Sequence, residues 1–183
     1  MSDQAEQLYD RAKAGDPAAA SGLITLYYER IFAYFRRLSG NDEDAQDLTQ
    51  KTFLKVWSSL RSYQKRSSLC TWIHGVAHHV YVDWRRSRDS SQWQSDDWWQ
   101  TCMADGPNPF EDVAEKELAH RLYSLVEQLE EGNKQTVHLH YYQGLSLKDT
   151  AEVLGVATST VKYRLREALN FLRSQTAEPK FRT

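Results

Sequence analysis

Apolar side chains recur every three or four positions along most of this chain, which is the spacing of helices that bury one face. The first stripe, in residues 17–39, follows an Asp16-Pro17 pair typical of a helix start and ends at Gly40. The second stripe, in residues 42–60, stays on one face of the next helix. The pattern therefore predicts two consecutive amphipathic helices joined by a short turn.

The second predicted helix has a distinctive outward face. Four residues lie three or four positions apart on the side away from the apolar stripe: Asp47, Gln50, Lys51 and Leu54. Core packing does not require a leucine among these polar groups. The face can therefore dock a partner, although a solvated helix face with one stray leucine gives the same pattern.

A third apolar stripe, in residues 69–84, predicts a helix that ends in a basic cluster. Arg85, Arg86 and Arg88 suit the C-terminal end of a helix, because cations there interact favourably with the helix dipole. Three arginines in four residues also make a tip that can bind phosphate groups.

The helical periodicity stops in residues 89–112, a segment with two prolines and many acidic side chains. We expect an irregular acidic linker here. Its large aromatic rings would pack on the chain's own domains or on a partner: Trp93, Trp98 and Trp99. The sequence therefore predicts an all-α protein of two small helical domains, residues 1–88 and 113–175, followed by a tail, residues 176–183.

The second predicted domain ends in a helix-turn-helix pattern. After two apolar stripes within residues 118–143, Ser146-x-x-Asp149 resembles a capping box at the start of a short helix. Gly155 then turns the chain, and Thr158 can cap a last, longer helix. This spacing is that of a helix-turn-helix unit.

The second helix of such a unit enters the major groove, where its outward side chains contact base edges and phosphates. Seven residues of the last predicted helix are placed to do so: Thr158, Ser159, Thr160, Lys162, Tyr163, Arg166 and, at the flank, Arg164. The hydroxyl and amide groups at its N-terminus can also bind a phosphate. The alternative is a three-helix unit that has only a packing role. However, a turn glycine, a helix cap and a basic outward face occur together here, as DNA binding requires.

The charges are distributed unevenly, although the net charge is only -2. Residues 61–88 carry 6 basic side chains and 1 acidic side chain. Residues 132–183 carry 8 basic and 4 acidic side chains. Residues 89–131, between them, carry 2 basic and 11 acidic side chains. The pattern favours two surfaces that can each meet a polyanion, joined by a segment that should avoid one. Chance clustering on solvated faces remains the alternative on charge alone.

Several classes of protein are excluded by composition and motifs. No long apolar run could span a membrane, and the N-terminus lacks the pattern of a secretory signal, so we expect a cytoplasmic location without membrane insertion. Cys70 and Cys102 are too far apart for a Cys-x-x-Cys site, which fits a reducing compartment. No phosphate-binding loop or common catalytic motif occurs, so we expect neither an enzyme nor a cofactor.

One rival interpretation is a metal- or redox-sensing protein. Cys70, His74 and His78 lie four residues apart on the third predicted helix, which places a thiol and two imidazoles on one helix face. Side chains on three successive turns of a helix are a long span for one ion, and no fourth ligand is nearby. We therefore predict no metal site.

Over nearly its whole length the chain resembles the extracytoplasmic function (ECF) sigma factors, which are two-domain bacterial transcription initiation factors. Three stretches carry the resemblance: YYERIFAYFRRLSGNDEDAQDLTQKTFLKVWSSL, SLCTWIHGVAHHVYVDWRRSR and GLSLKDTAEVLGVATSTVKYRLREALNFLR. Their order and separation are more specific than any one motif alone. The resemblance implies a sigma domain 2-like unit before the linker and a sigma domain 4-like unit after it.

The resemblance also implies partners and roles. The helix with the D-L-T-Q motif would dock on core RNA polymerase through Asp47, Gln50 and Leu54, with Lys51 beside them, and the last helix would bind the −35 promoter element as duplex. The third helix would open the −10 element and hold an exposed base. Its contributors would be Leu69, Cys70, Thr71, Trp72, His74, His78, Arg85 and Arg86. An anti-sigma protein is a further expected partner.

The sequence departs from the family pattern at several of these positions. Lys51 stands where an acidic residue is common, and Leu69-Cys70 replaces an aromatic and basic pair. Gly75 and His79 stand where arginine and asparagine are usual. The preferred −10 sequence therefore cannot be taken from relatives. A stand-alone helix-turn-helix regulator is the remaining rival function.

Overall fold

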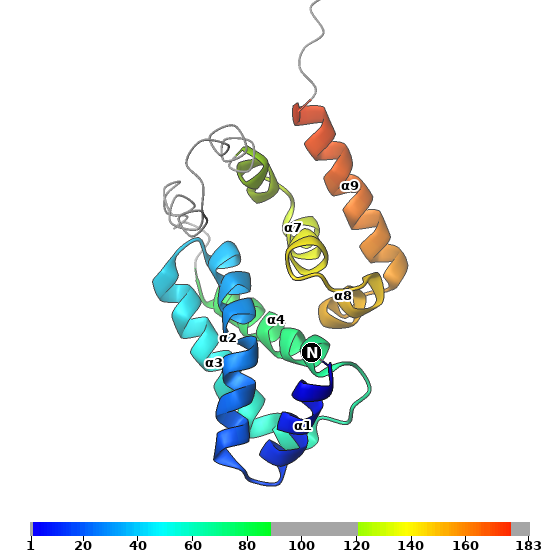
Figure 1. Cartoon of the computed structure of the whole chain (residues 1–183). Coiled ribbons are helices and arrows are strands. Elements are labelled where there is room, and N and C mark those ends of the chain that lie inside the picture. The colour runs from blue at the N-terminus through cyan, green and yellow to red at the C-terminus, as the bar shows by residue number, and fades with distance from the viewer. Residues whose placement is uncertain (1, 89–120, 177–183) are drawn as a thin grey trace, which may run out of the picture.

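The computed structural model describes residues 2–88 and 121–176, and these residues contain helices, turns and loops but no strand (Figure 1). The predicted all-α fold is confirmed. The helices are α1 (Ser2–Lys13), α2 (Pro17–Ser39), α3 (Asp42–Ser59), α4 (Leu69–Ser87), α7 (Glu131–Val137), α8 (Leu147–Leu154) and α9 (Thr158–Thr176). Residues 121–127 are also helical. The predicted linker with its three tryptophans, Cys102 and all but the first residue of the predicted tail lie outside the described residues.

The boundaries of α2 and α3 follow from capping interactions that the sequence predicts. Asp16 caps α2, because its Oδ1 accepts hydrogen bonds from the backbone N–H groups of Ala18 at 2.9 Å and Ala19 at 3.3 Å. Gly40 ends the helix in the left-handed conformation, with φ of 74°. Asn41 caps α3 by accepting a hydrogen bond from the backbone N–H of Asp44 at 2.8 Å.

The helix α1 was not predicted. Its side chains Ala5, Tyr9 and Ala12 are buried, at the same three- and four-residue spacing that identifies the other helices. The Tyr9 hydroxyl donates to the Tyr63 carbonyl at 3.2 Å, and the two rings meet edge to face. The stripe is short and consists partly of alanines, so its apolar signal in the sequence is weak.

The N-terminal bundle forms around α2, α3 and α4. Its largest fully buried side chains come from all three helices and include Ile31, Tyr34, Phe35, Leu48 and Ile73. Burial of this much apolar surface is the main stabilising term for a small helical bundle. The bundle fixes α3 and α4 so that each has one face in the core and one face turned away from it.

The C-terminal unit contains the predicted helix-turn-helix, formed by α8 and α9. Ser146 caps α8, since its Oγ accepts a hydrogen bond from the backbone N–H of Asp149 at 3.1 Å. Gly155 ends α8 with φ of 64°. The helix α9 begins at Thr158 itself, and the preceding Ala157 accepts the first helical hydrogen bond from Val161 at 3.2 Å, so Thr158 is not the cap residue.

The segment before α8 is also helical. The predicted helix near residues 134–143 begins earlier, at Glu131, and continues from α7 into a π-helical turn, η2 (His138–Tyr142). A second, smaller apolar core holds this unit together and includes Val126, Val137, Val161 and Leu165.

The two units pack against each other. The helices α4 and α8 lie side by side, and η2 also contacts α2 (Figure 1). Leu139, Leu145 and Val153 of the C-terminal unit are buried in the apolar cluster of the N-terminal bundle. The structure is therefore a closed arrangement in which the helix-turn-helix unit covers one face of α4.

Candidate protein and nucleic-acid interfaces

The outward face of α3 is accessible. Asp47, Gln50 and Lys51 are exposed, and Leu54 is 70% exposed. Lys51 Nζ lies 2.6 Å from Asp47 Oδ2, so the lysine forms an ion pair within this face. An exposed leucine beside polar and charged groups is typical of a protein-binding surface rather than of a folded core.

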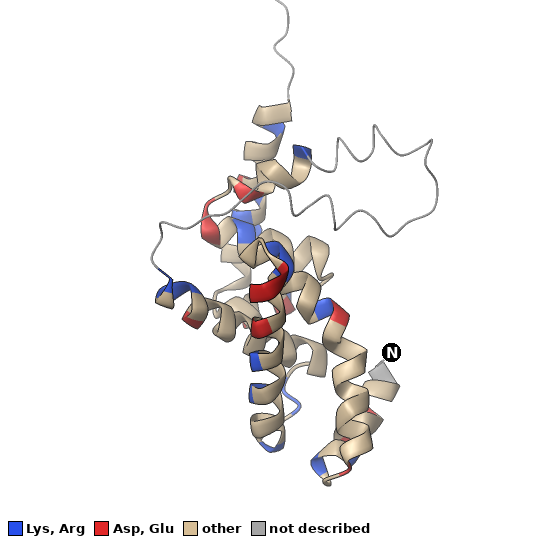
Figure 2. Ribbon diagram, turned by 90° about the vertical axis from the view of Figure 1, so that its left-hand side faces the viewer, with Lys and Arg blue, Asp and Glu red and all other residues tan. Residues whose placement is uncertain are grey.

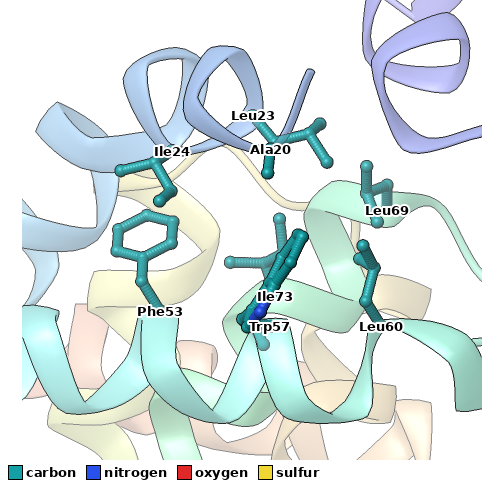
Figure 3. A pocket seen from close by; sticks show the side chains of 9 residues that line it. Ala20, Leu23, Ile24, Phe53, Trp57, Leu60, Leu69 and Ile73 are labelled. Atoms are coloured by element: carbon teal, nitrogen blue, oxygen red, sulfur yellow. The ribbon is translucent and has the colours of Figure 1, made fainter. Parts of the chain in front are cut away.

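Sequence reasoning missed an apolar extension of this face. Trp57, one helical turn after Leu54, is 50% exposed, and Ile24 of α2 is 40% exposed. Both side chains line a small apolar pocket with a cavity volume of about 20 Å³, enough for about one water molecule (Figure 3). The spacing of Leu54 and Trp57 is readable in the sequence, but the approach of α2 that completes the pocket is not.

The outward face of α9 is also accessible and is basic and aromatic. Thr158, Ser159, Lys162 and Arg166 are exposed, Thr160 is half-buried, and Tyr163 is 54% exposed. The Arg166 guanidinium lies over the Tyr163 ring, 5.5 Å from its centroid, as a cation–π pair. The first turn of α9 contains no acidic residue. The face therefore presents donors and an aromatic ring without a repelling carboxylate at the helix start.

Arg164 differs from its neighbours on α9. Its side chain is half-buried and lies against α7, so closely that a Cβ added at Gly132 would stand 3.0 Å from the Arg164 Cζ. Its charge also acts on His78 of α4. Arg164 therefore lies where α9, α7 and α4 approach one another.

The predicted −10 residues on α4 are mostly covered. Leu69, Thr71 and His74 are buried, whereas Cys70, Trp72, His78 and Arg85 are half-buried and Arg86 is exposed. The Trp72 ring packs on Tyr63, with 5.1 Å between the ring centroids, which gives it a structural role in the bundle. Figure 2 shows the basic end of α4, where Lys and Arg are blue.

Polar contacts join α4 to the C-terminal unit. The Thr71 hydroxyl donates to Asp149 Oδ1 at 2.9 Å, and His74 Nε2 lies 3.4 Å from Gln143 Oε1. At the other end of the helix, Glu131 forms an ion pair with Arg85. The buried Tyr81 hydroxyl donates to the same carboxylate at 2.9 Å.

Burial determines the protonation of the α4 side chains. It lowers the pKa of His78 to about 4, with smaller contributions from the charges of His79 and Arg164. Burial also lowers the pKa of His74 and raises the pKa of the Cys70 thiol. At neutral pH, the imidazoles of His74 and His78 are therefore uncharged, and the Cys70 thiol is protonated.

The structure does not bring the three predicted metal-site candidates together around an ion. The Cys70 Sγ lies 3.6 Å from His74 Nδ1, but that nitrogen is also 2.8 Å from the Cys70 carbonyl oxygen. Among residues 2–88 and 121–176, no group of three His, Cys, Asp or Glu side chains is placed to hold a metal ion. In the same ranges, no helix is both long and apolar enough for a membrane crossing.

Comparison with known proteins identifies the family. Residues 23–91 match Sigma-70 region 2, and residues 119–172 match Sigma-70, region 4. The ECF RNA polymerase sigma factor SigF of Caulobacter vibrioides is 32% identical over 88% of this chain and 88% of its own length. The chain belongs to the ECF family of RNA polymerase sigma factors.

Solved structures have the same fold as this sigma factor. CnrH in complex with the cytosolic domain of CnrY matches with a TM-score of 0.70 and 21% identity, over 94% of this chain and 96% of that chain. The sigma factor RpoE in complex with the anti-sigma factor NepR from Bartonella quintana matches with a TM-score of 0.63 and 19% identity. This match covers 86% of this chain and 98% of that chain.

This sigma factor is a transcription initiation factor that binds core RNA polymerase and promoter DNA. The rival function, a stand-alone helix-turn-helix regulator, is not favoured, because the region 2 match covers the N-terminal bundle. The family assignment thus accounts for both domains.

Proposed function

We propose that three separate faces of this sigma factor divide the work of promoter recognition. Asp47, Gln50, Lys51 and Leu54 of α3 bind core RNA polymerase, and the extended apolar surface at Trp57 belongs to the same interface. The observation that carries this assignment is the 70% exposure of Leu54 on a helix whose opposite face is fully packed.

The α9 face binds the −35 element in the major groove. Lys162 and Arg166 donate to guanine edges or phosphates, and Tyr163 supplies apolar contact next to them. The hydroxyls of Thr158, Ser159 and Thr160 stand at the helix N-terminus, where a phosphate is favourably bound. Arg164 binds at the flank of this site, where its side chain also lies against Gly132 of α7.

The α4 face opens the −10 element and holds its unpaired strand. Thr71, His74 and His78 offer hydrogen-bonding groups along one side of the helix, and Leu69 and Cys70 stand at its start. Arg85 and Arg86 form the basic support for the backbone. Trp72 contributes mainly through the packing of the bundle.

The remaining assignments follow from these roles. Residues 1–88 form the unit for polymerase docking and −10 recognition, and residues 113–175 form the −35 unit. Residues 89–112 connect them, and residues 176–183 form a tail.

The protein acts through binding energy without enzymatic activity, in the cytoplasm where the polymerase works. An anti-sigma protein is a partner, as it is for the structurally similar RpoE.

Binding to core RNA polymerase tests the central assignment. We expect Leu54→Asp to abolish co-elution with purified core polymerase in size-exclusion chromatography. Gln7→Asp adds the same charge at an exposed position of α1, outside the proposed interface, and should leave the complex intact. Equal binding by both variants would remove Leu54 from the interface.

A further inference from the structure

The loop that leads into α4 has an unusual backbone conformation. It joins the short helix η1 (Leu60–Ser62) to Leu69, the first residue of α4 and one of those assigned to the −10 strand. Lys65 in this loop has φ of 54° and is the one residue other than glycine with a positive φ in the part of the chain that the structure describes. A residue with a Cβ is strained in this left-handed region, so contacts with the rest of the protein must hold it there.

The helix α1 supplies contacts that hold Lys65. The Lys65 Nζ donates to Asp10 Oδ1 at 3.0 Å and lies 5.1 Å from the centroid of the Tyr9 ring. The hydrogen bond to Asp10 raises the pKa of Lys65, because it favours the charged ammonium. An ion pair and a cation–π contact thus fix the strained residue to α1.

Tyr63 connects the same loop to both α1 and α4. Its carbonyl accepts a hydrogen bond from the Tyr9 hydroxyl at 3.2 Å, and its own hydroxyl donates to the Ser67 carbonyl. The Tyr63 ring packs on the Tyr9 ring and on the Trp72 ring, with 5.1 Å between the ring centroids in each pair. The three rings therefore join α1, the loop and α4 in one packed cluster.

None of the three proposed faces includes α1, and the residues that match Sigma-70 region 2 begin after it. Its buried side chains pack on α2 and need no carboxylate. The Asp10 side chain is 61% exposed and pairs with the loop instead of packing in the bundle. This contact therefore serves the position of the loop rather than the burial of α1.

We propose that α1 is a positioning element for the −10 strand: Asp10 and Tyr9 hold Lys65 in its strained conformation and thereby fix the loop at the start of α4. This inference rests on the proposed assignment of the −10 element to α4. Asp10 is a positioning residue, because its carboxylate would repel DNA and acts through Lys65. Without this anchor the loop samples several conformations, so only a fraction of the molecules holds the geometry that binds the unpaired bases.

Asp10→Ala tests the anchor in the polymerase holoenzyme. The probe is a fluorescent promoter fragment, recovered by transcription of genomic DNA with this holoenzyme, in which the −35 element is duplex and the −10 strand is single. A second probe has its −10 bases in scrambled order. The matched control is Glu6→Ala, which removes the same charge at an exposed position of α1 one turn earlier. Glu6 also influences Lys65 through its charge, so the comparison isolates the direct ion pair with Asp10.

The measured quantity is the ratio of the affinities for the two probes. We expect Asp10→Ala to lower this ratio about threefold, since an exposed ion pair contributes only modestly. Charge alone predicts a different result, because loss of a carboxylate strengthens the binding of both probes alike. Glu6→Ala should keep the ratio, and Asp10→Glu should recover most of it. Affinity for a −35 duplex without the −10 strand should be the same in Asp10→Ala and Glu6→Ala.

The outcomes separate this inference from the proposed function. Equal ratios for Asp10→Ala and Glu6→Ala, with clear discrimination by the unsubstituted holoenzyme, would overturn the positioning role and leave the sigma factor roles intact. Absence of discrimination by the unsubstituted holoenzyme would overturn the assignment of α4 and the inference with it. If Asp10→Ala does not fold by circular dichroism, Tyr9→Phe is the second variant. It removes the hydroxyl that donates to Tyr63, keeps the ring and should lower the ratio in the same direction.

Discussion

The guanidinium of Arg166 lies over the ring of Tyr163, 5.5 Å from its centroid, on the exposed side of α9. The pair orients a cation and an aromatic edge towards solvent, where the major groove would be. Arg166 is thus partly preorganised for a base contact, and Arg164 is not, because it lies against α7.

Arg166→Ala should therefore weaken promoter binding by about 1 to 3 kcal/mol, the cost expected for loss of a specific base contact. Arg173→Ala, at an exposed position near the end of the same helix, removes the same charge away from the proposed site. Titration of the polymerase holoenzyme with promoter DNA at several salt concentrations measures both effects. An Arg166→Ala variant that binds like Arg173→Ala would remove Arg166 from the DNA interface.

The buried histidines of α4 predict a pH-dependent stability. The pKa of His78 is lowered to about 4 in the folded chain from 6.5, so the unfolded chain binds more protons between these values. The free energy of unfolding should fall as the pH is lowered from 6.5 towards 4. The lowered pKa of His74 acts in the same direction.

Urea unfolding at pH 7 and pH 5 measures this effect. His78→Gln should flatten the difference between the two pH values, because glutamine does not titrate. A pH dependence that is identical in His78→Gln and the unsubstituted chain would contradict the assignment.

The cap of α8 supports the whole helix-turn-helix unit. Ser146 Oγ accepts the backbone N–H of Asp149 at 3.1 Å, so Ser146→Ala should lower the free energy of unfolding by about 1 kcal/mol. Ser146→Asn keeps an acceptor at the cap without placing a second carboxylate beside Asp149, whose side chain accepts a hydrogen bond from Ser146, and it should retain most of the stability. Chemical denaturation monitored by circular dichroism compares the variants, and an unchanged midpoint for Ser146→Ala would show that the cap contributes nothing.

Local signals in the sequence were sufficient for most of the fold. Asp16, Asn41 and Ser146 stand at helix starts, and Gly40 and Gly155 at helix ends, because capping and left-handed turns depend on single residue types at fixed positions. The outward faces of α3 and α9 were likewise predictable from helical spacing. The helix α1 was missed because its buried stripe contains two alanines.

The covering of α4 could not be predicted in this way. Thr71 and Asp149 are 78 positions apart, and Tyr81 and Glu131 are 50 apart, so no periodic pattern links them. Sequence spacing predicts which side of a helix is polar, but the same polar side can face solvent, DNA or another domain. The structure was needed to show that the α4 face meets the C-terminal unit.

Transcription by reconstituted holoenzyme tests the account most directly. The purified chain is mixed with bacterial core RNA polymerase and a fragmented genomic library of the source organism, and the 5′ ends of the transcripts are sequenced. We expect discrete 5′ ends that share two upstream motifs. These transcripts should be lost with Leu54→Asp and reduced in amount with Arg166→Ala. Transcripts that start at random positions, or that do not depend on the added chain, would contradict it.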